Sequence, residues 1–298
     1  MKVWIEAMRL RTLPLTAAGV IVASGLAAFY GVLSWGLFFP MLIMALTLQV
    51  IANFADEYGD LEHGVDNDDR VGPHRGMQRG EITKEQMKRA LIGTSIFVFL
   101  LIIGLVVGAF GIKAIGWIVL FLALGAFCIW GAIRYTVGKH AYGYIGLGDF
   151  FSFFFFGIVA VVGGFFLYAK SMVALVWLPA VGLGLLVAGM INYNNMRDLE
   201  NDAACGKRTV ATMLGHRNAK IYHLLLVGGG MACFLAFPIA AGITAWWRYA
   251  FVLLYILYFK QLYTAIRITN PADFDALMKP HSLTAVAISL FFALCIAL

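Results

Sequence analysis

Acidic side chains in this sequence are concentrated in two short clusters. Ten of the sixteen acidic residues lie there, seven between positions 56 and 69 and three between positions 198 and 202. Each cluster directly follows an apolar stretch long enough to form a membrane helix. Charge is costly in such surroundings and indicates a site that holds something charged. A solvated helix end, the ordinary explanation of a charged run, accounts less well for acids gathered in two matched places.

The spacing within each cluster predicts a row of oxygen ligands along one helical face. Residues three or four positions apart share a side of a helix, provided that the apolar helices continue into the clusters. Stacked carboxylates repel one another unless cations lie between them, and Mg²⁺ suits such ligands because it completes its shell from water and substrate phosphates. Two facing rows would hold a diphosphate through bridging metal ions. The rows are Asn53, Asp56 and Asp60, spaced i, i+3 and i+7, and Asn194, Asp198 and Asp202, spaced i, i+4 and i+8.

Cations beside the clusters are candidates for binding phosphate oxygens, arginine through a bidentate fork and lysine as a point charge. Arg197 is the strongest candidate, because it lies between acids of the second cluster. For any single cation, anchoring to the inner membrane surface is an equally good explanation. The candidates near the clusters are Arg70, Arg75, Arg197, Lys207 and Arg208, and those after the fourth apolar stretch are Arg134 and Lys139.

A loop rich in glycine and tyrosine, residues 134–149, leads into an apolar stretch that begins with a run of phenylalanines. Tyr135, Tyr142 and Tyr144 predict a pocket for an aromatic substrate or for a carbocation, which the face of an aromatic ring stabilises. Anchoring at the membrane interface is the alternative for these tyrosines. Asp149 stands directly before the phenylalanines, and we predict a functional role for it. The phenylalanines predict a lipid-facing or core surface, or the wall of a groove for a long apolar chain.

Composition excludes an ordinary soluble domain. The mean hydropathy is +0.86, 62% of the residues are hydrophobic and 13% are charged. Apolar stretches of about 20 residues, enough to cross a bilayer as a helix, recur along the whole chain. We therefore predict an all-α polytopic membrane protein with about nine transmembrane helices. Their expected positions are 12–33, 36–55, 91–110, 114–133, 147–168, 172–193, 220–240, 246–264 and 281–298.

The basic residues orient these helices, because cytoplasmic loops are enriched in Lys and Arg. With the N-terminus inside, 19 of the 22 Lys and Arg residues fall on the inner face, and the other three are Lys113, Lys170 and Arg248. We predict a multi-pass protein of the cell inner membrane whose N-terminus and acidic clusters face the cytoplasm. The net charge of +6 fits attraction to an anionic leaflet. The expected partners therefore include the lipid bilayer, but neither nucleic acid nor an obligate protein partner.

The two clusters also indicate an internal repeat. One follows the second predicted helix and the other follows the sixth, and a basic inner loop comes after each. Two four-helix pseudo-repeats plus a ninth helix would place both clusters around a central cavity, as in other membrane folds with a site between repeats. Coincidence is the alternative, because every polytopic protein alternates loops and helices. Since neither a linker nor a low-complexity tail divides the chain, residues 1–298 are predicted to form a single integral membrane domain.

At these motifs the sequence resembles the UbiA superfamily of intramembrane prenyltransferases, and within it the subgroup that acts on 1,4-dihydroxy-2-naphthoate. The family's first motif, approximately Asn-x-x-Asn-Asp-Tyr-x-Asp-x-x-x-Gly-x-Asp followed by Asp-Arg-x-Gly-Pro, is matched between positions 53 and 73. Its second motif, Asn-Asn-x-Arg-Asp-x-x-x-Asp-x-x-x-Gly-Lys-x-Thr, is matched between positions 194 and 209, and residues 135–149 also resemble the subgroup. The resemblance covers the full length. One departure is that Asp56 and Glu57 stand where the pattern has Asn-Asp.

This resemblance implies that an allylic polyprenyl diphosphate alkylates an aromatic acid, with Mg²⁺ as cofactor. In this subgroup the ring carboxylate is lost as CO₂, which gives demethylmenaquinone in menaquinone biosynthesis. The implied metal ligands are Asp56, Glu57, Asp60, Asp66, Asp198 and Asp202. The predicted catalytic residues are Asp60, Asp198, Asp202, Asp149 and Lys139. The predicted substrate-binding residues are Asn53, Tyr58, Arg70, Arg75, Arg134, Tyr135, Tyr142, Tyr144, Asn194, Asn195, Arg197 and Lys207.

Other functions fit the sequence less well. A cation-coupled secondary transporter would carry its acids in the middle of broken helices, whereas here they follow the ends of apolar stretches. A CDP-alcohol phosphotransferase would carry the signature Asp-Gly-x-x-Ala-Arg, which this sequence lacks. Within the superfamily, an enzyme with another aromatic acceptor, such as 4-hydroxybenzoate, is the main alternative. The motif between positions 64 and 73 favours the naphthoate acceptor by resemblance.

Overall fold

The structure is a computed structural model that describes residues 2–66 and 74–298. Within those ranges the chain forms helices and turns without a β-sheet, and nine helical spans are long and apolar enough to cross a membrane. The spans are Lys2–Phe29, Trp35–Glu62, Lys84–Phe110, Ile115–Arg134, Gly148–Ala169, Ala174–Arg197, Val210–Ala240, Trp246–Arg267 and Pro271–Ala297. Each overlaps one predicted span, so the all-α polytopic fold is confirmed.

Some spans are single helices and others are composite. The single ones are α3 (Trp35–Glu62), α4 (Lys84–Phe110), α5 (Ile115–Arg134) and α10 (Val210–Ala240). The first span consists of α1 (Lys2–Ala7), η1 (Leu10–Thr12) and α2 (Leu13–Phe29), and the fifth consists of α6 (Gly148–Ser152), η3 (Phe153–Gly163) and α7 (Gly164–Ala169). The sixth consists of η4 (Ala174–Val176) and α8 (Trp177–Arg197), and the eighth of η5 (Trp246–Leu254) and α11 (Tyr255–Arg267). The ninth consists of η6 (Pro271–Phe274) and α12 (Asp275–Ala297). A short helix, α9 (Leu199–Ala204), follows α8. Helices throughout are expected, because a spanning segment must satisfy its backbone hydrogen bonds internally.

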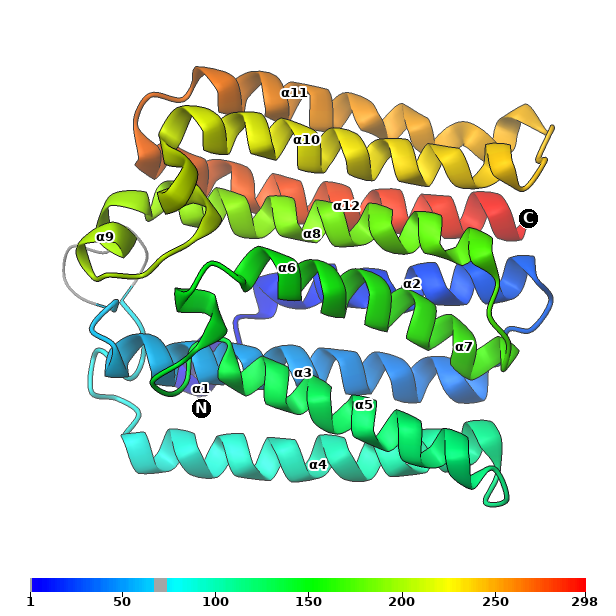
Figure 1. Ribbon diagram of the computed structural model, residues 1–298, viewed down its shortest axis with the longest axis horizontal. Helices are drawn as coiled ribbons and strands as arrows, with labels where there is room; N and C mark the ends of the chain where they lie inside the picture. Colours follow the sequence, from blue (N-terminus) through cyan, green and yellow to red (C-terminus); the bar gives the residue numbers. More distant parts are fainter. Residues whose placement is uncertain (1, 67–73) are drawn as a thin grey trace.

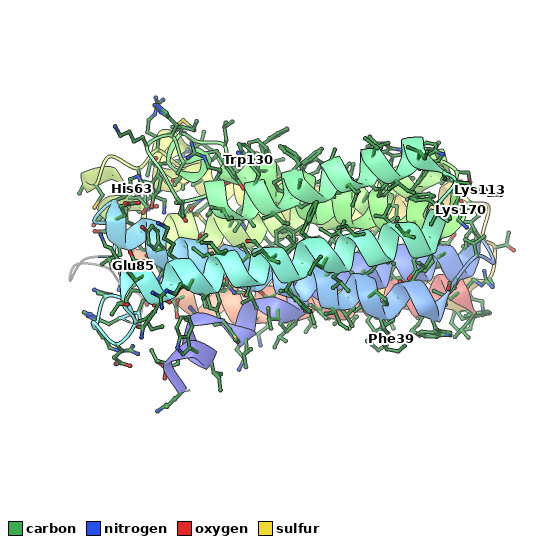
Figure 2. All side chains as sticks on the ribbon, turned by 90° about the horizontal axis from the view of Figure 1, so that it is seen from below. Phe39, His63, Glu85, Lys113, Trp130 and Lys170 are labelled. Carbon is green, nitrogen blue, oxygen red and sulfur yellow. The ribbon has the colours of Figure 1, made fainter. Side chains whose placement is uncertain are left out.

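The spans lie side by side, with both acidic clusters at one end of the bundle. The short helix α9 and the turns that follow α3 and α8 lie at that end, whereas the C-terminus lies at the opposite end (Figure 1). In the turned view, His63 and Glu85 lie at the cluster end, and Lys113 and Lys170 lie at the other (Figure 2). The loops that the charge pattern assigns to the inside and to the outside are therefore at opposite ends.

Small residues allow close contacts between the transmembrane helices. This is the usual way in which helices pack in a bilayer, where lipid supplies no hydrophobic drive for association. A Cβ atom on Gly25 of α2 would lie 2.4 Å from the Cβ atom of Ala293 on α12. A Cβ atom on Gly157, in the π-helical segment η3, would lie 2.5 Å from the carbonyl oxygen of Ala180 on α8. The first span is thus packed against the last, and α8 against the fifth.

Candidate active site

Side chains of both acidic clusters line one cavity of about 1000 Å³. Its wall comes from the N-terminal segment before α2, the ends of α3 and α8, the short helix α9 and the beginning of α12. Among the charged side chains that line it are those of Asp56, Asp60, Asp198, Asp202, Arg9, Arg75, Arg197 and Lys207. We call this space the polar cavity. The two clusters thus face one central cavity, as the predicted arrangement requires.

Asp60 is held at both of its carboxylate oxygens. Its Oδ2 atom accepts a hydrogen bond from Arg75 Nη1 at 2.9 Å, and its Oδ1 atom accepts one from the Tyr144 hydroxyl at 2.6 Å. The same Arg75 nitrogen lies 3.2 Å from Asp66 Oδ2. Burial raises the pKa of Tyr144 and the nearby Asp60 charge raises it further, so the hydroxyl stays a neutral donor. Tyr144, which the sequence predicts to bind substrate, therefore orients a carboxylate of the cavity.

Arg9 lines the cavity, although its sequence context shows only a basic residue before the first apolar stretch. Its Nη1 atom pairs with Asp56 Oδ2 at 3.0 Å. The left-handed backbone of Arg9, with φ of 46°, turns the chain between α1 and η1. Asn53 stabilises this turn by donating from Nδ2 to the Met8 carbonyl at 2.7 Å and to Thr12 Oγ1 at 3.0 Å. Asn53, a predicted substrate ligand, thus fastens the N-terminal segment to α3.

The second cluster does not continue a single helix. Asp198, with φ of −95° and ψ of 11°, separates α8 from α9. The prediction of one helical face is therefore right for the first cluster, which lies in α3 as far as Glu62, and wrong for the second. Arg197 bridges the break, since its Nε and Nη2 atoms donate to the two oxygens of Asp198 at 2.8 and 2.7 Å. It also donates to Asn194 at 2.9 Å and to Asp275, a cavity acid outside both predicted clusters, at 2.6 Å.

Lys207 and Asp202 form a further ion pair of the cavity, with Nζ 3.3 Å from Oδ1. Burial raises the pKa of Asp202 to about 6, although the charge on Lys207 opposes the shift. Burial lowers the pKa of Lys207, but the carboxylates of Asp202 and Asp60 outweigh burial and the pKa is raised overall. Lys207 therefore stays charged, and its ammonium group also lies 5.5 Å from the centre of the Tyr144 ring.

Several predicted site residues support the cavity from outside or from its edge. Glu57 Oε1 accepts a hydrogen bond from the backbone N–H of Met77 at 2.8 Å, which fixes the turn between α3 and α4. Tyr58 packs among apolar side chains. Asp149 and Asn195 are both buried, with Asn195 Nδ2 donating to Asp149 Oδ1 at 3.3 Å, and neither lines either cavity described here. Roles for these four residues in binding or catalysis stay predictions.

The loop after α5 is shaped by its own side chains. Arg134 Nη1 donates to a carbonyl oxygen of the same loop at 3.2 Å, and Lys139 is exposed. Tyr142 is buried, and its hydroxyl donates to the carbonyl oxygen of Gly131 at 2.6 Å. Substrate contacts of Arg134 and Tyr142 and a catalytic role of Lys139 stay predictions. Arg70, also predicted to bind substrate, lies outside the described residues.

A second cavity of about 250 Å³ adjoins the polar one, and we call it the apolar groove. Its wall comes mainly from apolar side chains of α3, α5 and η3, including phenylalanines of the run noted in the sequence. Burial raises the pKa of Tyr135 well above its usual value, so its ring is neutral where the two spaces meet. A charged chamber that shares part of its wall with an apolar groove suits a molecule with an anionic head and a long apolar tail. The residues that line both spaces are Gln49, Asp56, Tyr135, Phe156 and Ile191.

The oxygen donors fit Mg²⁺ in kind, but they do not form a complete cage. Asp202 is only 1% exposed, and within the described part of the chain its Oδ2 atom has no hydrogen-bond partner. Among the described residues, no three His, Cys, Asp or Glu side chains converge closely enough to hold a metal ion. Mg²⁺ commonly takes one or two carboxylates and completes its shell from waters and phosphates. The donor set therefore fits an ion that binds together with a phosphate group.

Known proteins resemble this chain in sequence and in fold. The sequence profile of the UbiA prenyltransferase family matches residues 16–296. The chain is 38% identical to the 1,4-dihydroxy-2-naphthoate octaprenyltransferase of Escherichia coli (strain K12), over 99% of this chain and 95% of that protein. It is 36% identical to the protein of the same name from Haemophilus influenzae, with the same coverage of both chains, 99% and 95%. The structure of a UbiA homolog from Aeropyrum pernix K1 has the same fold, with a TM-score of 0.69 at 17% identity over 92% of this chain and 96% of that one.

Proposed function

Because the chain belongs to the UbiA prenyltransferase family, we propose that it transfers a polyprenyl group from an allylic diphosphate to 1,4-dihydroxy-2-naphthoate, with release of diphosphate and CO₂. Relatives named for this acceptor match nearly the whole chain at 36% and 38% identity. The observation that carries the proposal is the junction of the polar cavity, lined by both aspartate clusters, with the apolar groove. A diphosphate head and an isoprenoid tail need these two environments side by side.

The polar cavity is suited to the departure of diphosphate. The residues that would hold Mg²⁺ are Asp60, Asp66, Asp198 and Asp202. When bound, the metal neutralises the negative charge that grows on the leaving group. Arg75 and Lys207 bring further positive charge to the same cavity. Positively charged and hydrogen-bonding groups that are positioned at the leaving group before the reaction lower the free-energy barrier to breaking the allylic carbon–oxygen bond. The electron pair of that bond leaves with the diphosphate.

The junction of the two spaces is suited to the cation that remains on the prenyl chain. Tyr135 and Phe156 line both cavities, and the faces of their rings stabilise positive charge. The apolar wall excludes water, which would otherwise capture the cation. The ring carbon of the naphthoate that carries the carboxylate then attacks the allylic carbon of the prenyl chain. The carboxylate leaves that ring carbon as CO₂. The groove meanwhile holds the isoprenoid tail.

We also propose that the polar cavity opens to the cytoplasm from the inner membrane. It lies at the end of the bundle that carries most of the basic loops, whereas Lys113 and Lys170 lie at the other end (Figure 2). An excess of Lys and Arg marks the cytoplasmic side of a multi-pass protein. Water-soluble acceptor and released diphosphate would then exchange directly with the cytoplasm.

The direct test incubates membranes that contain the protein with a polyprenyl diphosphate, Mg²⁺ and either 1,4-dihydroxy-2-naphthoate or 4-hydroxybenzoate. We expect a prenylated, decarboxylated product from the naphthoate only, and no product once a chelator removes the divalent metal. Product from 4-hydroxybenzoate alone would show that the acceptor is wrong within the family. Undiminished transfer in the presence of the chelator would contradict metal-dependent departure of diphosphate.

Gly163 in the apolar groove is predicted to affect which chain lengths of polyprenyl diphosphate the protein accepts. This residue lines the groove, and a Cβ atom there would meet only the side chains of Leu124 and Val159, each at 4.0 Å. Gly163→Leu therefore fills the groove without displacing backbone atoms. We expect kcat/KM to fall about tenfold or more for a long polyprenyl diphosphate but much less for dimethylallyl diphosphate, since a steric cost of about 1–3 kcal/mol affects only a tail that reaches it. Gly104→Leu on α4, where nothing lies within 4 Å, is the control, and equal losses with both donors would contradict the prediction.

A further inference from the structure

Every aspartate that lines the polar cavity is paired with an arginine or lysine. A buried carboxylate needs such a partner, because an isolated charge is strongly disfavoured in low-dielectric surroundings. A divalent cation that enters alone therefore meets carboxylates that already have a positively charged side chain beside them. The nitrogen–oxygen distances are 3.0 Å for Arg9 and Asp56, 2.9 Å for Arg75 and Asp60, 2.7 Å for Arg197 and Asp198, 3.3 Å for Lys207 and Asp202, and 2.6 Å for Arg197 and Asp275.

Arg75 differs from the other cations in that a single one of its nitrogen atoms contacts two carboxylates. Its Nη1 atom lies 2.9 Å from Asp60 Oδ2 and 3.2 Å from Asp66 Oδ2. All three side chains are nearly buried, with exposed fractions of 10%, 8% and 1%. A metal ion that approached either of these oxygens would lie beside the guanidinium, and the two positive charges would repel each other.

Tyr144, the second donor to Asp60 among the described residues, is held by contacts to its ring. The Tyr144 ring packs against His63 with ring centres 4.6 Å apart, and the Lys207 ammonium lies 5.5 Å from its centre. Arg75, like Tyr144, lies outside the helical spans, but its guanidinium carries a positive charge that would repel a metal ion, whereas the tyrosine hydroxyl is neutral. Of these two described donors, the guanidinium is therefore the one that gives way to a metal.

We propose that Arg75 is an exchangeable counter-ion: it pairs with Asp60 and Asp66 until a divalent cation and a diphosphate bind together, and it then releases the carboxylates to the metal and pairs with the diphosphate. No covalent bond changes in this exchange, and each charge keeps a partner of opposite sign. The inference rests on the proposed function, which supplies diphosphate as the anion. Its consequence is reciprocal coupling, in which metal and diphosphate each raise the affinity for the other by the same factor.

The test measures Mn²⁺ bound to detergent-purified protein by equilibrium dialysis, with and without inorganic diphosphate. In the wild type we expect weak binding of Mn²⁺ alone and an affinity about tenfold or more higher with diphosphate. Arg75→Gln should bind Mn²⁺ alone about tenfold more tightly than the wild type, because the competing charge is gone, and should gain little from diphosphate. Arg89→Gln, an exposed residue of α4 outside the cavity lining, removes the same charge and should change neither value.

The outcomes separate the exchange from the proposed function. Suppose that diphosphate raises the Mn²⁺ affinity of the wild type, but that Arg75→Gln binds Mn²⁺ alone no more tightly than the wild type. This result would overturn the exchange at Arg75 and leave the proposed function standing. Absence of Mn²⁺ binding to the wild type under both conditions would overturn the exchange and the metal-dependent function together. Arg75→Met serves if the Gln variant cannot be purified: it keeps an unbranched side chain of similar bulk but removes the charge, so it should bind Mn²⁺ alone more tightly than the wild type. Equal affinity would overturn the exchange.

Discussion

Alanine in place of Asp198 is expected to abolish prenyl transfer while the protein stays folded and inserted in the membrane. Asp198 lines the polar cavity and receives two hydrogen bonds from Arg197. As a proposed metal ligand it would hold the cation that neutralises the charge on the leaving diphosphate, and loss of one stabilising contact to a developing charge ordinarily lowers kcat about 10²–10³-fold. Asp60→Ala is expected to have the same effect from the other cluster. Turnover with dihydroxynaphthoate in membranes, at saturating donor, measures both.

The fold is expected to survive these changes, because each released cation keeps a second acid. Arg197 remains paired with Asp275 at 2.6 Å, so the break between α8 and α9 stays bridged. Asp273→Ala, an exposed acid before α12 and outside the cavity lining, is the control and should retain activity within about twofold. Near-normal turnover in Asp198→Ala or Asp60→Ala would refute the assignment of that residue as a metal ligand.

The spans and the meeting of the two clusters are predictable from the sequence because they depend on local, additive properties. A long apolar stretch in a bilayer has to be helical, since only a helix satisfies its backbone groups internally. The row of Asp56 and Asp60 is predictable for a related reason: α3 continues unbroken as far as Glu62, so the helical spacing holds. The loops at the cluster end follow from the distribution of Lys and Arg.

The pairing inside the cavity is not predictable from the sequence, because it depends on contacts between distant segments. Arg9 and Asp56 are 47 positions apart, and Tyr144 and Asp60 are 84 positions apart. No spacing rule connects such residues, so the sequence shows Arg9 only as a basic residue before the first apolar stretch and Tyr144 only as a candidate substrate ligand. The break at Asp198 is hidden for another reason: the i, i+4, i+8 pattern is satisfied in sequence whether or not the helix continues.

Gly59→Ala is expected to lower both stability and turnover, although alanine favours helices. A Cβ atom at this position in α3 would lie 2.5 Å from the carbonyl oxygen of Thr136 and 2.6 Å from its carbonyl carbon. Backbone atoms cannot rotate away, so α3 and the segment that carries Tyr135 must separate. Overpacking of this kind costs about 1–3 kcal/mol, which exceeds the gain of about 1 kcal/mol for alanine over glycine in a helix. The separation also displaces Asp60, and a shift of about 1 Å in a catalytic group lowers turnover about 10²-fold.

Thermal unfolding in detergent and turnover in membranes measure the two effects separately. Gly104→Ala on α4 is the matched control, because nothing lies within 4 Å of a Cβ atom there, and it should be neutral or stabilising. Because Asp60 follows Gly59 directly, the close contact between Gly59 and the backbone of Thr136 positions the Asp60 carboxylate. A Gly59→Ala protein that unfolds at the wild-type temperature and turns over at the wild-type rate would show that this contact does not position Asp60. Loss of turnover together with stability would show that the packing of α3 against the loop after α5 is part of the catalytic apparatus.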